Sequence, residues 1–339
     1  MTLNNINTTS NRDLALDLFR AFGIFCMIVG HVGFGAKVDH FIHAFHMPLF
    51  FFVSGIFFNS KKSFESFMIN KTKKILIPYF SFATFYYIVW LIADSSNSLW
   101  YFPLKYLLWN NSVGAGSGMP YAGALWFLTA FFVANIVYFC IRVFIKSSYL
   151  QFIVVLFVVS IGTLLPLVLP SRLPYTIDAG MIGVGFMYCG YLFKKSNQYE
   201  KLTNLSLPIL MFMSIVLVLL IFFNGYVNMR MGTYSNVALF WINALGCIIV
   251  GINFCKFIVR KTKNVSLSYL ILSWISIMGR DSLIFLCVNE FVIFTLRRTI
   301  YFDNKIILHL TYLILTILIC YLINYVIQNT KLKIFIGKY

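Results

Sequence analysis

The chain has 339 residues, of which 60% are hydrophobic and only 11% are charged, and it contains 37 Phe and 20 Tyr. A water-soluble fold of this size could not hide so much apolar surface in its core, so the composition indicates an integral membrane protein. The formal net charge of +17 could suggest a nucleic-acid partner. Basic residues in membrane proteins usually mark cytoplasmic loops, however, and we therefore expect no nucleic-acid binding.

The chain begins with a polar segment, residues 1–13, which lacks the basic stretch of a cleaved signal peptide, so we expect a retained cytoplasmic N-terminus. Repeated apolar runs follow, each near the roughly 20 residues that an α-helix needs to cross a bilayer. Segment 264–278 fits either an interfacial helix or an early start of the ninth span. Hydropathy predicts one domain, residues 1–339, an all-α polytopic membrane bundle of about ten transmembrane helices, at 14–32, 44–59, 75–94, 121–141, 150–169, 174–193, 206–224, 236–255, 279–296 and 306–328.

The charge distribution predicts the orientation of these spans. With the N-terminus inside, most of the 27 Lys and Arg residues fall in cytoplasmic segments. Both termini, including the basic tail 330–339, are therefore expected in the cytoplasm. The long outer loop 95–120 mixes aromatic residues with Gly and Ser, so it could cover a site from outside or serve as a passive cap.

The seven cysteines occur singly inside apolar runs, without a CxxC pair. We expect them to be small buried hydrophobic side chains rather than disulfides or zinc ligands.

The first span, "DLFRAFGIFCMIVGH", contains three ionisable residues, Asp17, Arg20 and His31. An ionisable group inside a membrane helix costs a few kcal/mol, so each is a candidate functional residue. Arg20 and His31 fall within about 20° of one helix face but are separated by a rise of about 16 Å, so they must contact different groups. Asp17 and Arg20, at i and i+3, can pair. The alternative is structural, a salt bridge plus a histidine satisfied by another helix.

The second span opens with "HAFHMPLFFFVSGIFF", which places His43 and His46 near His31 in a two-helix hairpin. The two spans offer no Asp, Glu or Cys at ligand spacing with these histidines, so we expect no metal site. A general base or proton donor fits better, because imidazole titrates near neutral pH. For Ser54 and Gly55 we favour a helix-packing contact over a catalytic hydroxyl. Further intramembrane candidates are Asp178, Arg280, Asp281 and Glu290.

These motifs resemble those of the membrane-bound acyltransferase 3 family, which O-acylates cell-surface sugars. Arg20 and His31 match its Arg-x10-His signature. The second-span motif is matched by Phe45, His46, Pro48 and the run to Ser54 and Gly55, and its wording is closest to the fucose 4-O-acetylase-like subgroup.

Other family motifs are matched with substitutions. Lys74 stands where the family usually has Arg, before Pro78 and Tyr79, and "LWFL" at 125–128 contains Trp126. Near the C-terminus, Leu286 and Asn289 occupy the places of the family's Tyr and His. This departure favours His31 as the catalytic histidine.

The resemblance implies acetyl-CoA as a donor substrate, no permanently bound cofactor, and a saccharide or lipid-linked glycan as acceptor, within the bacterial cytoplasmic (inner) membrane. The phosphates of CoA would be held by basic side chains, for which Lys71, Lys73 and Lys74 are candidates, with Arg20 deeper in the membrane. His31 would act as general base or form an acyl-histidine. His46 would orient His31 or the acceptor, or make only a structural hydrogen bond. Asp17, Ser54 and Trp126 are expected to support the site.

Two other functions remain open at this point. A transporter or flippase of glycan intermediates would also be polytopic with intramembrane charges, although the chain shows no clear internal repeat. A receptor or assembly protein without chemistry would predict that His31→Ala leaves function intact.

Overall fold

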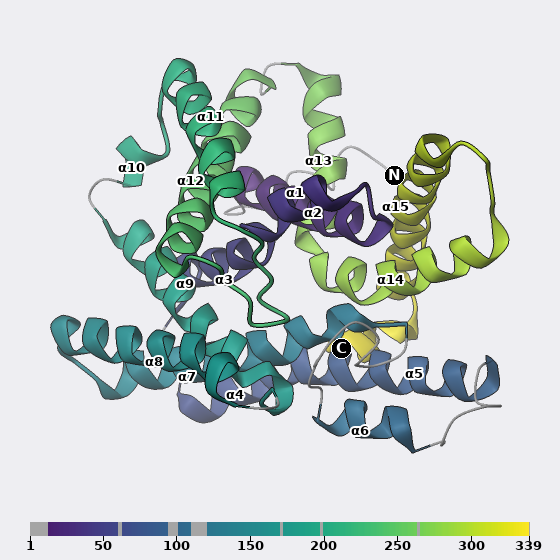
Figure 1. Ribbon diagram of the computed structural model, residues 1–339, viewed down its shortest axis with the longest axis horizontal. Helices are drawn as coiled ribbons and strands as arrows, with labels where there is room; N and C mark the ends of the chain where they lie inside the picture. Colours follow the sequence, from purple (N-terminus) through teal and green to yellow (C-terminus); the bar gives the residue numbers. More distant parts are fainter. Residues whose placement is uncertain are drawn as a thin grey trace.

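The computed structural model describes residues 13–59, 63–93, 101–109, 121–169, 172–196, 199–262 and 265–338. These residues form helices and loops, with one isolated bridge between Asn228 and Thr233, which confirms the predicted all-α bundle. Figure 1 shows α1 and α3 in the middle of the molecule, with α11 and α12 on one side and α14 and α15 on the other. The helices are α1 Leu14–Val32, α2 Ala36–His43, α3 His46–Ile56, α4 Phe64–Lys71, α5 Ile77–Ala93, α6 Phe102–Trp109, α7 Trp126–Phe144, α8 Ser148–Val168, α9 Ile177–Lys195, α10 Tyr199–Leu202, α11 Leu207–Phe223, α12 Val237–Thr262, α13 Ser266–Arg280, α14 Ser282–Thr299 and α15 Lys305–Asn329.

Helix α1 is closed at both ends by local hydrogen bonds. The Asp13 side chain accepts from two amides of the first turn, which satisfies donors that a helix start leaves without partners. At the other end Gly33 adopts φ +86°, and the Arg297 guanidinium on α14 donates to the carbonyls of His31 and Val32. The contact from Arg297 fixes the C-terminal ends of α1 and α14 beside each other.

Helices α3 and α9 pack closely through glycines. A methyl group at Gly55 would overlap the carbonyl oxygen of Met187, and one at Gly190 would overlap that of Phe52. Small residues allow this approach in membrane helices, where van der Waals packing drives association. The packing role that the sequence favoured for Gly55 is therefore confirmed.

Residues 64–93 form one long helix interrupted by a π-helical turn at Thr72–Leu76, between α4 and α5. Such turns are rare and often occur at functional sites. Here the turn carries Lys73 and Lys74.

The segment before the ninth predicted span is a separate helix, α13. It meets α14 at Asp281 with a bend of 79°, and its Gly279 packs against the backbone of α1 near Asp17. The break in the chain therefore lies beside the beginning of α1.

Seven described helices are long and apolar enough to cross a membrane, and the bent pair α13–α14 could add an eighth. Each of the ten predicted spans falls on a helix, but α11 has 17 residues and α3 only 11. The chain is a multi-pass membrane protein, while the exact number of spans and the side of the termini remain predictions. The expectation that the cysteines are buried side chains is met, because all seven are buried or partly buried.

Two predicted segments lie largely outside the described residues. Of the polar N-terminus only Asp13 is described, and of the outer loop 95–120 only residues 101–109, which include α6.

Candidate active site

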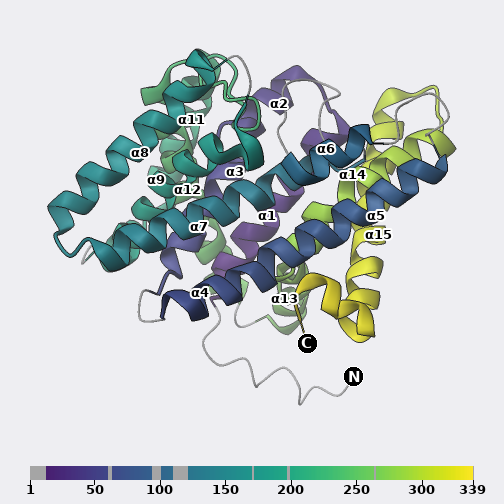
Figure 2. The ribbon, with the colours of Figure 1, turned by 90° about the horizontal axis from the view of Figure 1, so that it is seen from below.

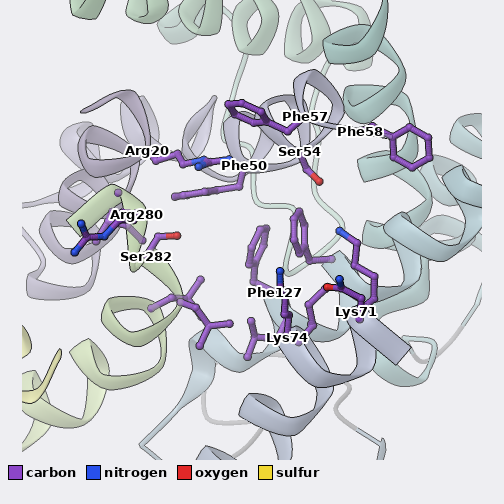
Figure 3. A pocket seen from close by; sticks show the side chains of 18 of the residues that line it. Arg20, Phe50, Ser54, Phe57, Phe58, Lys71, Lys74, Phe127, Arg280 and Ser282 are labelled. Atoms are coloured by element: carbon purple, nitrogen blue, oxygen red, sulfur yellow. The ribbon is translucent and has the colours of Figure 1, made fainter. Parts of the chain in front are cut away.

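Four of the predicted site residues line one cavity, which we call the Arg20 cavity. It has a volume of about 500 Å³. Figure 3 shows Arg20, Ser54 and Phe57 across the cavity from Lys71 and Lys74, with Arg280 at one side. Aromatic side chains of α3 and α7 form much of the remaining wall, including Phe50 and Phe127. The cavity thus combines cationic groups at its edge with an apolar interior.

Arg20 is held in position by two contacts. Its Nη1 lies 3.1 Å from Oδ1 of Asp17, which confirms the predicted pair. Its guanidinium lies over the Phe57 ring, 5.0 Å from the centroid. A guanidinium presents five N–H donors in a planar fork, a shape that suits an anionic ligand.

The lysines around the π-helical turn divide into two groups. Lys71 and Lys74 line the Arg20 cavity, and the Lys71 ammonium also lies over the Phe67 ring at 5.3 Å. Lys73 has an exposed side chain and does not line this cavity. The structure therefore brings together three of the four predicted basic residues.

Ser54 contacts α7 and the Arg20 cavity. Its Oγ is 3.5 Å from Oδ1 of Asn135, and the residue lines the Arg20 cavity. Its neighbour Gly55 packs against the backbone of α9 at Met187.

A second cavity, which we call the His31 cavity, contains the histidine cluster. It is small, about 60 Å³, and it is lined by His31, His43, His46, Trp126 and Arg230, among others. The sequence predicted that the three imidazoles would lie close together, and this geometry is confirmed. A volume of this size holds a few water molecules or a small polar group.

The surroundings of His31 determine its tautomer. Asn289 donates through Nδ2 to the carbonyls of Phe285 and Leu286, so its Oδ1 is the atom facing His31. That oxygen lies 2.6 Å from Nδ1 of His31. Because an amide oxygen can only accept, Nδ1 must carry the proton, and Nε2 is left to accept a proton in the neutral ring.

Glu290 faces the other ring nitrogen of His31. Its Oε1 lies 3.4 Å from Nε2, and its Oε2 accepts from the amide of Ala124 at 2.8 Å. The absence of a side chain at Gly123 makes room for both the Glu290 carboxylate and the Arg230 guanidinium. The carboxylate is therefore held where it can stabilise a positive charge on His31.

Arg230 brings a permanent charge to this end of the site. Burial lowers the pKa of the Arg230 guanidinium, whereas the Glu290 carboxylate acts in the opposite direction. The group stays protonated at neutral pH because its ordinary pKa is so high.

The other two histidines are tied to the backbone of α2. His46 is buried and donates through Nδ1 to the carbonyl of Ile42 at 2.8 Å, while His43 does the same to the carbonyl of Asp39 at 2.9 Å. A structural hydrogen bond at His46 is therefore present, and its Nε2 is available for other contacts. The rings of His43 and His46 are 4.9 Å apart.

Asp39 anchors the outer part of this cluster. Burial by itself raises the pKa of Asp39, but hydrogen bonds from His43 and Tyr226 outweigh it and lower the pKa below its ordinary value. The Tyr226 hydroxyl donates to Oδ2 at 2.7 Å. The Asp39 carboxylate is thus ionised at neutral pH, and its contacts hold the His43 imidazole and the Tyr226 hydroxyl in place.

The Arg20 cavity and the His31 cavity lie in succession along three helices. On α1, Ile24 lines the first and Met27 the second; on α3, Phe50 lines the first and Met47 the second. On α7, Trp126 faces the His31 cavity and the next two residues face the other. Only about one helical turn, roughly 5 Å, therefore separates the two spaces.

Two of the remaining intramembrane candidates, Asp178 and Arg280, form ion pairs. Asp178 is ion-paired with Arg172 and is 1% exposed, away from both cavities. Arg280 pairs with Asp281 at the α13–α14 break.

Sequence reasoning named Glu290 as a candidate but missed its contact with His31. It also missed Arg230, which lies in a loop where no periodic pattern could have indicated it. Among the described residues, no group of three or more His, Cys, Asp or Glu side chains is arranged to hold a metal ion.

Comparison with known protein families matches residues 13–325, nearly the whole chain, to the acyltransferase domain of the acyltransferase 3 family. No curated protein and no solved structure matches the chain.

Proposed function

Because the chain belongs to the acyltransferase 3 family, we propose that this membrane acyltransferase moves an acetyl group from acetyl-CoA to a hydroxyl of a saccharide or of its lipid-linked precursor. The observation that supports the proposal is the succession of two cavities along α1. One is cationic and apolar, and the other, one helical turn further, is lined by His31, whose Nδ1 faces the Asn289 oxygen and whose Nε2 is left as the base.

The Arg20 cavity suits the donor. CoA has a long, weakly polar pantetheine arm that ends in the thioester and a phosphorylated nucleotide at its other end. The aromatic wall matches the arm, and Arg20, Lys71 and Lys74 match the phosphates, since charge-assisted hydrogen bonds are the strong ones.

When the phosphates bind at the basic residues and the pantetheine arm lies along the aromatic wall, the thioester at the end of the arm points toward the His31 cavity. The side chains between the two spaces include Met27 and Met47, which are flexible enough to let the end of the arm pass.

Acetyl transfer at His31 needs only the donor thioester and the acceptor hydroxyl as reactants. The acceptor hydroxyl attacks the thioester carbonyl, a C–O bond forms, and the C–S bond breaks. Nε2 takes the hydroxyl proton as general base and returns it to the sulfur of the leaving CoA. Glu290 stabilises the imidazolium in between, and the Asn289 oxygen holds the ring in the required tautomer.

An acetyl-imidazole at Nε2 is the alternative route, and it uses the same nitrogen. His43, His46 and Arg230 then surround the acceptor hydroxyl.

The proposal also implies on which side of the bilayer acetyl-CoA enters. With both termini in the cytoplasm of a bacterial cell, the Arg20 cavity opens on the cytoplasmic side of the inner membrane, where acetyl-CoA is made. Lys71, Lys74 and Lys338 lie at that end, and Arg230 and Arg297 lie at the end of His31.

The proposal is tested with membranes that contain the wild type, His31→Gln or His309→Gln. His309 is on α15 against Phe34 and does not line the His31 cavity, so it is a matched control. Each membrane receives radiolabelled acetyl-CoA and a crude lipid-linked glycan fraction, and alkali-labile label is counted.

We expect His31→Gln to lose at least about 100-fold of the label, the usual contribution of a general base, and His309→Gln to retain it. Equal labelling by His31→Gln would refute the role of His31. No label from the wild type with verified donor and acceptor would instead favour transport of glycans or another acyl donor.

A further inference from the structure

A third cavity lies beside the Arg20 cavity and shares part of its wall. It has a volume of about 490 Å³ and is lined by residues from four segments of the chain. Lys74, Arg280 and Leu283 line both cavities, so the two cavities are direct neighbours. We call it the Lys338 cavity, because Lys338 lines it and not the Arg20 cavity.

The C-terminal segment is fixed against this cavity. The short helix Lys331–Ile336 follows α15 and buries Ile336. The next residue, Gly337, has φ +70° and lies so close to the Lys73 carbonyl that any side chain would overlap it. Figure 2 shows the C-terminal segment, in yellow, at the same end of the molecule as α4 and α13. The backbone therefore places Lys338 at the cavity.

A buried carboxylate organises the cations at this place. Asp281 is 4% exposed in its side chain and lies 3.3 Å from both the Lys338 ammonium and the Arg280 guanidinium. The amide of Asn324 also donates to it, at 3.4 Å. Three cations, Lys74, Arg280 and Lys338, thus line a cavity to which Asp281 contributes a single negative charge.

Lys338 and Arg280 have more N–H donors than their described contacts use. The Lys338 ammonium has three donors and uses two within its described contacts, with Asp281 and with Gln328 at 3.0 Å. Arg280 uses Nε and Nη2 for Asp281, and a guanidinium has five donors. The side chain of Lys338 is 52% exposed and that of Arg280 is 42% exposed, so a ligand can reach both.

We infer that the Lys338 cavity binds the phosphate monoester at the nucleotide end of CoA, with Lys338 and Arg280 as ligands. The inference rests on the proposed function and extends its donor site to a second cavity. With the pantetheine arm in the Arg20 cavity, the nucleotide must lie toward the side where the wall is shared. A phosphate monoester carries close to two negative charges at neutral pH, which matches the excess of positive charge.

The test compares CoA with 3′-dephospho-CoA, which differs only by this phosphate. Their affinities are measured by calorimetry on the full chain in nanodiscs of zwitterionic lipid, for the wild type, Lys338→Gln, Arg280→Gln and Lys331→Gln. Lys331 is exposed on the same C-terminal segment and does not line either cavity, so it serves as the matched control. Lys338→Arg tests whether charge alone restores binding.

We expect the wild type and Lys331→Gln to prefer CoA over 3′-dephospho-CoA by roughly tenfold or more. In Lys338→Gln and in Arg280→Gln this preference should fall to a few-fold, with the affinity for 3′-dephospho-CoA unchanged, and Lys338→Arg should restore it. An unchanged preference in both Gln variants would overturn the inference while leaving the donor assignment intact. A wild type that binds neither compound would overturn the acetyl-CoA proposal and the inference together.

An anionic lipid headgroup has related chemistry, and a second arm separates it from the nucleotide. The same proteins are placed in nanodiscs with anionic phospholipid, and bound lipid is counted by native mass spectrometry. Lipid retention that depends on Lys338, together with an unchanged preference for CoA, would assign the cavity to a headgroup and overturn the inference.

Discussion

Replacement of Asn289 by Ala removes the oxygen that determines the tautomer of His31. The two atoms are 2.6 Å apart, and Asn289 is fully buried on α14. When His31 takes the acceptor proton its ring becomes positive, and the hydrogen bond from Nδ1 becomes a bond to a charged group. Such bonds contribute about 1.5 to 3 kcal/mol. Since about 1.4 kcal/mol changes a rate tenfold, kcat should fall roughly 10- to 150-fold.

The same change should leave donor binding unaffected. Asn289 does not line the Arg20 cavity, so the KM for acetyl-CoA should stay within about twofold of the wild type. The assay measures initial rates of acetyl transfer in membranes at several acetyl-CoA concentrations, with the amount of folded protein determined by size-exclusion chromatography in detergent.

Two further variants make the test specific. Asn243→Ala removes an equally buried amide, 1% exposed on α12, that donates to the Leu220 carbonyl and does not contact His31. Asn289→Asp keeps an acceptor oxygen toward His31 but loses the two bonds that Nδ2 donates, so it should recover part of kcat. The reasoning is wrong if Asn289→Ala retains full kcat while folded, or if Asn243→Ala loses as much.

Three further predictions concern other contacts. Glu290→Gln should lower kcat by about tenfold or more with little change in KM, because a neutral amide stabilises the His31 imidazolium less well. An unchanged kcat in steady-state rates would contradict this role. Arg20→Lys should raise the KM for acetyl-CoA by roughly tenfold because the planar fork is lost, and an unchanged KM would remove Arg20 from the donor site. Asp39→Asn should lower the melting temperature at neutral pH. Because the pKa of Asp39 is lowered in the folded state, its ionised carboxylate stabilises the fold at every pH above the ordinary pKa of 3.8. This stabilisation is lost as the pH falls through the folded-state pKa. The difference in melting temperature should therefore vanish in that acidic range, and a difference independent of pH would contradict the assignment.

The sequence allowed much of the helical architecture to be predicted, because a helix that crosses the hydrocarbon needs a run of about 20 apolar residues, which is visible in the sequence. It could not indicate that α3 would end after 11 residues, since "FFFVSGIFF" stays apolar beyond Ile56. Nor could it place the break at Asp281, because the surrounding residues read equally well as one continuous helix. Both features lie next to a glycine that packs against another helix, Gly55 in α3 and Gly279 in α13.

The candidate site was predictable where residues share one helix or one motif. The pair of Asp17 and Arg20 followed from spacing within a helix, and the proximity of His31 to His46 from a short hairpin. The contacts of His31 with Asn289 and Glu290 depend instead on how α14 lies beside α1, which a single sequence does not reveal. The position where the chain departs from the family's usual His is the one that contacts His31.

The short α3 also has an electrical consequence. Its 11 residues span about 16 Å, roughly half the hydrocarbon thickness, and cavities reach it from both ends. If each space were open to water on its own side of the membrane, the membrane voltage would fall mainly across the turn between Met47 and Phe50 and not across the whole bilayer. Moving one elementary charge through the full voltage changes its energy by about 2.3 kcal/mol per 100 mV. A proton that entered from one side and left on the other would cross nearly all of that field within a single turn, so the rate of such a transfer would follow the energised state of the cell.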